Sequence, residues 1–540
     1  MHRAFLAFLL AASIVPVLVV DTLPLHDFPG HYARLRILAA YDHDPAFASH
    51  YERLSFLLPN IAFDAVVLAL SSVMTVKTAS QLFVAAAVLM CGIGVACLQR
   101  ALFGELSLSV IAGVMLALNG ILLWGFVNYL FGVGLMLLAF AAWVASRSRM
   151  LQLATGTAAS FLLLFSHLVA FGLYALLVFG WEVEGLLRRR WPFARVAASG
   201  LQFVPATLLF LTMRTASEDP LAFRWVNHPA EKLEFIVRSL TTLVPPADLA
   251  LGLAALVILA MAARRRLRLA LDPRMRLPLS IVGLAFVALP FSMFGSHFLD
   301  ARIPIAFFLL LAGSARLTAA DSGARRAAEA TLAGACLIRV ATIVAAWSGY
   351  DAAFRALDFK GVGQGDVVFT AAAPRRGLAD RLADWQPPMT FAAAYAAPSG
   401  AFVPSVFADP RHQPLAVRRE LAHLQRLQTL LPIAVADAQA LQRVALELRA
   451  ASPFQRTFLF LLRCRNLPLG DDPAYTVVSV QDRACLLRLG ERGPPGQDAQ
   501  APANVGSAAA GRGGGALERG AGLWQLAAAP ARGDAAVAQW

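Results

Sequence analysis

A carboxylate with basic neighbours follows the first apolar run of the chain. Asp27 lies between His26 and His31 in the stretch LPLHDFPGHYARLR, and Arg34 comes one helical turn after His31. On a helix such a pair shares a face. A carboxylate in a partly dehydrated position has its ionisation tuned by nearby cations, which suits a general base. The same residues also allow a structural role, in which Asp27 caps the next helix and Arg34 pairs with lipid headgroups.

Two prolines predict how this stretch folds. Pro24 and Pro29 oppose a continuous helix out of the apolar run, so we expect a turn at Asp27 and a new helix over 31–38. Asp64 is a second carboxylate, in an apolar segment. It would lie either on a helix that dips into the site or on a surface helix with one polar contact.

Further candidates for a binding site occur at later turns. His167, between two apolar runs, could face a cavity, although a buried histidine bonded to the backbone is the commoner case. His297, Asp300 and Arg302 are close together in sequence and could form an ion pair or part of a metal site. Because no third ligand is visible, we expect no metal, and a divalent cation is the only cofactor considered. Arg302 could also simply anchor a helix end.

The composition is that of a membrane protein. Of 540 residues, 58% are hydrophobic and 15% charged, and the mean hydropathy is +0.62. The net charge of +13 comes with arginines in short runs between apolar segments, where they set orientation in a membrane. This pattern excludes nucleic acid as the expected partner.

The apolar segments predict a mainly α polytopic protein with about 11–12 transmembrane helices, since a span needs roughly 20 apolar residues. The segment 56–74 is ambiguous because it carries Pro59, Asn60 and Asp64. Candidate spans are 5–20, 79–98, 107–124, 127–144, 151–165, 168–181, 193–211, 249–262, 279–294, 303–315 and 331–347.

The arginine runs predict the orientation. With a cytoplasmic N-terminus and 56–74 kept on the outer surface, every arginine cluster falls inside. The alternative lets 56–74 span and joins 151–181 into one helix, but it places Arg147 and Arg149 outside. We therefore expect a multi-pass protein of a cell membrane, such as a bacterial inner membrane, with outer loop 21–78.

The chain changes character after the last span. Strand-length apolar runs such as GDVVFT and AYTVVSV, and a charged helical pattern over 416–449, predict a small extracytoplasmic mixed α/β domain over 349–490 after a membrane module over 1–348. The Ala/Gly/Pro-rich tail 491–540 is expected to be disordered. Cys464 and Cys485 could form a disulfide outside the cytoplasm or remain two thiols.

Four stretches carry a resemblance to a known superfamily. They are the Asp27 stretch, LQRALFG (98–104), NGILLWGFVNYLFG (119–132) and GSHFLDARIPIAFFLLLAG (295–313). In this order and architecture the chain resembles the GT-C membrane glycosyltransferases, which include protein O-mannosyltransferases and aminoarabinose transferases. Asp27 and Tyr32 match the acidic motif of the first outer loop. Phe28 stands where a second acid is common, and Asn128 and Tyr129 stand where relatives carry an arginine and an acid.

The resemblance implies transfer of a sugar from a polyprenyl-phosphate donor to a glycan, lipid or protein acceptor outside the cytoplasm. Arg34, Arg302 and Arg224 would stabilise the phosphate leaving group in the membrane interface. Asp27 would deprotonate the acceptor hydroxyl, which gives inversion at the sugar carbon. His26 and His31 would orient Asp27 or contact the phosphate.

Two other functions compete with this one. A lipid or glycan transporter would favour two similar halves and polar residues near mid-membrane, but the ionisable groups here lie mostly at ends and turns, apart from Arg339. A non-catalytic scaffold of the same fold is the third possibility, since the second acid is missing.

Overall fold

The protein forms two compact units, one of residues 1–370 with 387–432 and one of residues 371–386 with 433–540. The segment 387–432 groups with the helical unit, whereas the sequence assigned it to the domain over 349–490. The computed structural model describes residues 3–213, 225, 229–293, 296–356, 359, 361–375, 393, 396–428, 432–470, 472–481 and 484–490. The tail 491–540 and Arg224 lie outside these residues.

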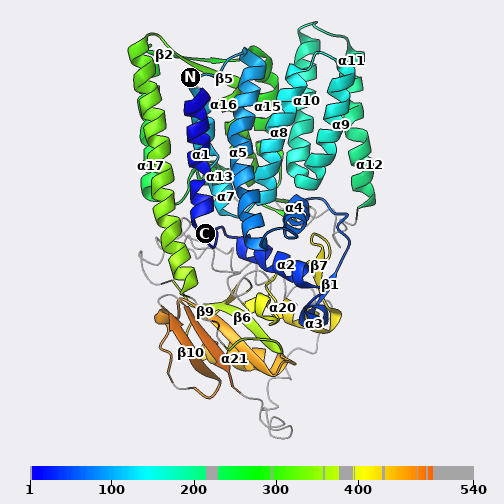
Figure 1. Ribbon diagram of the computed structural model, residues 1–540, viewed down its shortest axis with the longest axis vertical. Helices are drawn as coiled ribbons and strands as arrows, with labels where there is room; N and C mark the ends of the chain where they lie inside the picture. The colour runs from blue at the N-terminus through cyan, green and yellow to red at the C-terminus, as the bar shows by residue number, and fades with distance from the viewer. Residues whose placement is uncertain are drawn as a thin grey trace. The chain divides into compact units, whose positions relative to one another are not determined.

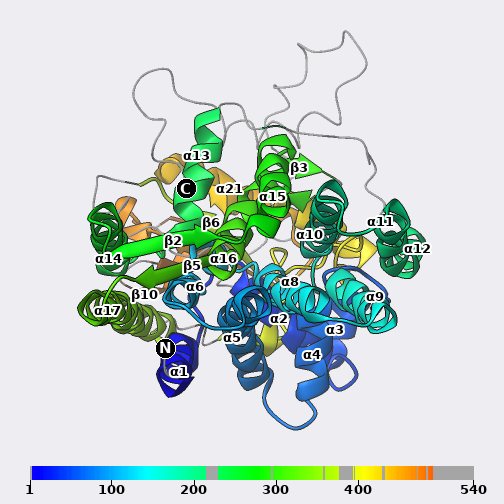
Figure 2. The same ribbon diagram turned by 90° about the horizontal axis from the view of Figure 1, so that it is seen from above.

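The first unit is a bundle of helices that run side by side (Figure 1). Seen along the bundle, α14 and α17 lie together at one edge and α11 and α12 at the opposite edge (Figure 2). The helices are α1 (Arg3–Val19), α2 (Phe28–Ala40), α3 (Pro45–His50), α4 (Ala62–Leu70), α5 (Val76–Phe103), α6 (Ser109–Leu116), α7 (Gly120–Leu123), α8 (Val127–Ala145), α9 (Arg149–Ser166), α10 (Leu168–Leu187), α11 (Phe193–Gly200), α12 (Val204–Thr212), α13 (Pro229–Leu240), α14 (Pro245–Ala263), α15 (Arg276–Ala288), α16 (Ile303–Ser314), α17 (Ser322–Arg355) and α20 (Ala422–Leu427).

Short strand pairs connect segments of the first unit. The pairs are β1 (Tyr51–Arg53) with β7 (Leu415–Val417), β2 (Leu267–Leu271) with β5 (Ala315–Ala319), and β3 (Ser292–Met293) with β4 (Ser296–His297), all antiparallel. The β1–β7 pair joins residues 51–53 to residues 415–417, which explains why that later segment groups with the helices.

Small residues let α5 and α8 pack closely against each other. A Cβ on Gly94 would lie 2.6 Å from Leu137 Cβ, and one on Gly134 would lie 2.6 Å from Met90 Cβ. Helices in membranes gain stability from such close approach. Six helices in the described part of the chain are long and apolar enough to cross a membrane. The predicted mainly α membrane protein is confirmed.

The ambiguous segment 56–74 does not form a spanning helix. Its helix, α4, has nine residues, well short of the roughly 20 that a span needs. The segment 151–181 forms two helices, α9 and α10, that break at His167. The helices therefore divide as in the first of the two assignments, and the orientation in the membrane stays a prediction.

Two elements of the bundle differ from the sequence prediction. The predicted span 107–124 is broken because the Asn119 side chain donates to the carbonyls of Leu116 and Ala117 and accepts from the Leu122 amide, which starts α7. The amphipathic helix α13, within the loop after α12, was not predicted. A Cβ on Gly120 would lie 1.9 Å from the Arg238 carbonyl oxygen, so the glycine lets α13 approach α7.

Strands β8, β9, β10 and β11 of the second unit belong to a five-stranded mixed sheet in the order β10–β11–β9–β6–β8, with α21 against β9 and β11. The predicted strands GDVVFT and AYTVVSV fall in β6 and β10. The prediction of a helical segment over 416–449 is wrong, because Pro432 and strand β8 separate α20 from α21. Cys464 and Cys485 form a disulfide, with their Cα atoms 5.8 Å apart. The bounds are β6 (Asp366–Ala372), β8 (Ile433–Ala434), β9 (Arg456–Leu462), β10 (Tyr475–Gln481), β11 (Ala484–Leu489) and α21 (Ala438–Ala451).

Candidate active site

Asp27 occupies the N-cap position of α2, at the predicted turn, but its side chain makes no capping hydrogen bond. Instead, Asp27 Oδ1 lies 3.0 Å from His26 Nδ1. Since a carboxylate only accepts, Nδ1 of His26 carries the proton. The Asp27 side chain is 25% exposed. The acid is therefore held in one orientation and remains accessible to a substrate.

The turn after α7 holds the backbone of Asp27. The His26 amide donates to the Leu123 carbonyl at 2.7 Å and the Asp27 amide to the Trp124 carbonyl at 3.2 Å. Gly125 completes this turn at φ +86°. A Cβ at Gly125 would lie 2.6 Å from the Asp27 amide nitrogen and 2.8 Å from Asp27 Cβ. Only glycine permits this contact, so the sequence WG at 124–125 positions the acid.

Arg302 supplies a buried guanidinium close to Asp27. It ends the 3₁₀ turn η3 (Asp300–Arg302) before α16, and Tyr129 of α8 donates its hydroxyl to the Arg302 carbonyl at 2.7 Å. The guanidinium carbon lies 4.4 Å from the centre of the Phe126 ring. Burial lowers the pKa of Arg302 to about 10, while Tyr129 and the Asp27 carboxylate act in the opposite direction. Arg302 therefore stays cationic at neutral pH, within electrostatic reach of Asp27.

Arg34 does not face the site as predicted. It forms a bidentate ion pair with Asp64 of α4, from Nε to Oδ1 at 2.7 Å and from Nη2 to Oδ2 at 2.8 Å. Both side chains are 1% exposed. The pair neutralises the Arg34 charge away from solvent, so Arg34 and Asp64 attach α2 to α4, and Asp64 rather than a lipid phosphate compensates the Arg34 charge.

His31 is neutral in this arrangement. Its Nδ1 accepts from Arg34 Nη2 at 3.0 Å, and burial together with the Arg34 charge lowers the pKa of His31 well below its usual value. The ring packs edge-on against Phe63 and Phe407. His31 therefore presents an Nε2–H donor rather than a cation.

Asn128 and His167 hold the backbone around α4. Asn128 accepts from the Phe63 amide at 2.8 Å and donates to the Asn60 carbonyl at 2.6 Å. The Asn60 side chain accepts from the Leu168 amide at 2.8 Å. His167 Nδ1 accepts from the Val169 amide and starts α10. These contacts give both predicted binding residues structural roles.

Asp300 is likewise part of a structural pair. It is fully buried, and its Oδ2 lies 3.1 Å from Lys232 Nζ of α13, which also donates to the carbonyls of Phe286 and Leu289. His297 is exposed on β4. In the described part of the chain no three His, Cys, Asp or Glu side chains gather to hold a metal, and the expected absence of a metal stays a prediction.

Aromatic residues near Asp27 and Arg302 were missed from the sequence. Trp124 and Phe126 flank Gly125, and Phe298 lies 5.1 Å from Trp124 between ring centres. All three side chains are half-buried. The sequence WGF at 124–126 could have indicated a turn with aromatic side chains, but nothing in the sequence showed that Phe298 lies beside it. The predicted Tyr32 is half-buried and stacks on Phe28 at 6.0 Å.

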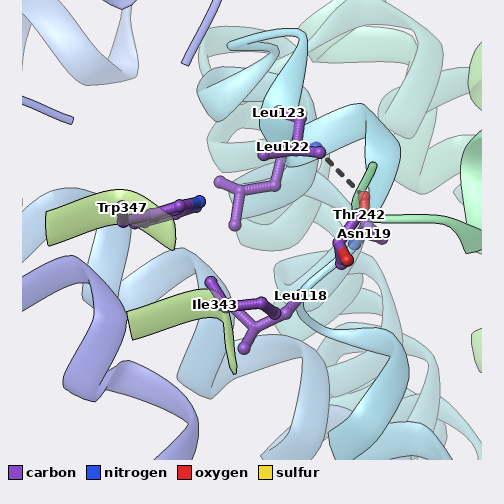
Figure 3. A pocket seen from close by; sticks show the side chains of 7 residues that line it. All are labelled: Leu118, Asn119, Leu122, Leu123, Thr242, Ile343 and Trp347. Carbon is purple, nitrogen blue, oxygen red and sulfur yellow. Dashed lines mark hydrogen bonds between the residues drawn. The ribbon is translucent and has the colours of Figure 1, made fainter. Parts of the chain in front are cut away.

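A pocket elsewhere in the unit is apolar. Its lining residues are Leu118, Asn119, Leu122, Leu123, Thr242, Ile343 and Trp347, and the Asn119–Leu122 hydrogen bond borders it (Figure 3). Because no predicted site residue lines this pocket, the candidate active site is the Asp27–Arg302 region.

Comparisons with known proteins find similarity in structure only. No protein family and no curated protein matches the sequence. The chain is similar to the crystal structure of ArnT from Cupriavidus metallidurans bound to undecaprenyl phosphate, with a TM-score of 0.47 and 12% identity over 90% of this chain and 97% of that chain. The apo ArnT structure has a TM-score of 0.46 and 14% identity over the same shares. ArnT is an aminoarabinose transferase of the GT-C type, the group that the sequence resemblance names.

Proposed function

We propose that the protein is a membrane glycosyltransferase that moves a sugar from a polyprenyl-phosphate donor to a hydroxyl of a glycan, lipid or protein acceptor outside the cytoplasm. The observation that carries the proposal is the arrangement of Asp27 and Arg302. A partly exposed carboxylate is held by His26 and by the turn at Gly125, within electrostatic reach of a buried guanidinium. Undecaprenyl phosphate, the ligand of one similar crystal structure, is the first carrier to test.

Asp27 and Arg302 suit the two partners of a displacement reaction, the attacking hydroxyl and the departing phosphate. Asp27 takes the proton of the acceptor hydroxyl as its oxygen bonds to the anomeric carbon. The bond from that carbon to the phosphate oxygen breaks, and its electron pair leaves with the polyprenyl phosphate. Arg302 stabilises the charge that develops on this leaving group. Attack opposite to the leaving group inverts the anomeric carbon.

The proposal places the site at the outer face of a cell membrane, with the N-terminus in the cytoplasm. The arginine clusters between the apolar segments support this orientation through the positive-inside rule. The Cys464–Cys485 disulfide supports an extracytoplasmic second unit, because disulfides persist in oxidising compartments.

The test replaces the Asp27 carboxylate with an amide of similar shape that cannot act as a base. We expect Asp27→Asn to lower kcat/KM by about 10²–10⁴-fold in nanodiscs with labelled undecaprenyl-phosphoryl sugars, the range of general-base contributions. The matched control is Asp42→Asn, since Asp42 is 64% exposed and paired with Arg53. If Asp27→Asn transferred sugar at the wild-type rate, Asp27 would not be the general base. If the wild-type protein transferred no sugar from any donor, the proposed function would be wrong.

A further inference from the structure

We infer that Trp124 and Phe298, with Phe126 behind them, form an aromatic platform that binds the sugar ring of the donor. These three residues are called the aromatic platform below. The inference rests on the proposed function and assigns the sugar-binding part of the same site.

The three rings form one cluster although they come from distant parts of the chain. The centre of the Trp124 ring lies 5.7 Å from that of Phe126 and 5.1 Å from that of Phe298. The Phe126 and Phe298 centres are 6.4 Å apart. These separations are typical of interacting aromatic side chains. The turn after α7 and the residue after β4 therefore build one apolar surface.

The platform joins the two ends of the proposed reaction. At one end, the Trp124 carbonyl accepts from the Asp27 amide. At the other, the Arg302 guanidinium lies over the Phe126 ring. In the donor, the anomeric carbon carries the phosphate, and the acceptor attacks this carbon from the opposite side. With the phosphate at Arg302 and the acceptor hydroxyl at Asp27, the anomeric carbon lies between these two groups, and the sugar ring attached to it lies beside the platform that connects them.

The chemistry of the platform fits a sugar ring. All three side chains are half-buried, so they keep aromatic surface accessible beside charged groups. The electron-rich face of an aromatic ring attracts the weakly positive C–H hydrogens on the face of a pyranose or furanose. Trp124 offers the largest such face, within the turn that holds Asp27.

The backbone at Phe298 indicates that its ring position is enforced by the fold. Phe298 adopts φ +60°, a left-handed conformation that bulky residues rarely adopt. Its ring also packs against Phe291, with the ring centres 4.7 Å apart. Such conformations persist where the surrounding structure over-determines them and gather at ligand sites.

The experiment compares two lipids that differ only in the sugar. Full-length protein in nanodiscs, without acceptor, is titrated with undecaprenyl phosphate and with undecaprenyl phosphate carrying glucose, mannose or aminoarabinose. For the tightest sugar-bearing lipid we expect Trp124→Ala to weaken binding about tenfold, while sugar-free undecaprenyl phosphate changes by less than about twofold. Trp124→Phe, which keeps an aromatic face, should restore most of the affinity.

Controls separate this role from folding and from lipid binding. Phe298→Leu keeps an apolar side chain but removes the ring, and it should reproduce the selective loss if Trp124→Ala does not fold. Phe193→Ala, at a side chain that is 71% exposed on α11, should change neither affinity. Equal losses for both lipids, or no loss for either, would overturn the inference. Wild-type protein that binds none of the lipids would overturn the proposed function itself, and the inference with it.

Discussion

Gly125→Ala is the sharpest test of how the fold positions the acid. The new Cβ would lie 2.6 Å from the Asp27 amide nitrogen, 2.8 Å from its Cβ and 3.0 Å from its Cα. Two of these atoms belong to the backbone, so the Asp27 loop must move away from the Trp124 turn. The amide of Asp27 would then lose its hydrogen bond to Trp124.

The cost can be worked from the two features of this position. The left-handed conformation, φ +86°, costs an alanine about 1–2 kcal/mol. Forcing extra volume into a packed contact costs about 1–3 kcal/mol more. A shift of about 1 Å at a reacting group costs roughly 100-fold in rate. We therefore expect a loss of about 2–5 kcal/mol in stability and a drop of about 100-fold in sugar transfer.

Gly104→Ala is the matched control for this variant. Gly104 has a similar conformation, φ +76°, at the end of α5, but a Cβ there meets nothing within 4 Å. It should lose about 1–2 kcal/mol in thermal unfolding and keep its transfer rate. If Gly125→Ala matches Gly104→Ala in both thermal unfolding and transfer rate, the contact with Asp27 does not position the acid and our reasoning is refuted.

Three further predictions concern the buried charges. Arg34→Met should cost about 3–5 kcal/mol in thermal unfolding because it leaves the Asp64 charge buried alone, whereas the double variant Arg34→Met/Asp64→Leu should recover most of that loss and keep the KM for the lipid donor within about twofold. Because the folded pKa of His31 is lowered, its stabilising contribution is present above about pH 6.5 and lost as the pH falls; wild type should lose about 1.4 kcal/mol more than His31→Gln between pH 7.5 and 5.5. Lys232→Met should destabilise the fold by about 3–5 kcal/mol through the unpaired Asp300, and an unchanged melting temperature would contradict that role.

Local patterns in the sequence predicted the local parts of this structure. The prolines before and after Asp27 indicated the turn, and α2 contains the predicted helix over 31–38. Hydropathy located the apolar helices because each must bury or shield a run of apolar residues. The break at Asn119–Gly120 was missed, although this dipeptide inside an apolar run is a turn signal.

The partners of the charged residues could not be read in the same way. His31 and Arg34 are neighbours on one helix, and their contact follows from spacing. The bond from Arg34 to Asp64 joins two helices, and no local pattern encodes which distant carboxylate meets which guanidinium. Lys232 was missed for a related reason, because its helix α13 falls in a loop that hydropathy left unassigned.

The ion pairs of the buried charges differ from the arrangement of charges at the proposed active site. Burying a charge is costly unless an opposite charge accompanies it. Within the described residues, the buried Arg34 and Arg339 and the half-buried Lys232 meet this condition with a carboxylate within 3.2 Å, in the pairs Arg34–Asp64, Arg339–Asp248 and Lys232–Asp300.

The Asp27–Arg302 region is built differently. The acid that acts on Arg302 is Asp27, yet its carboxylate is bonded to His26 and is a quarter exposed. The guanidinium carbon of Arg302 lies 4.4 Å from the centre of the Phe126 ring. A partly exposed acid near a buried guanidinium is the arrangement that the proposed displacement needs, because the acid can meet the hydroxyl and the guanidinium the phosphate.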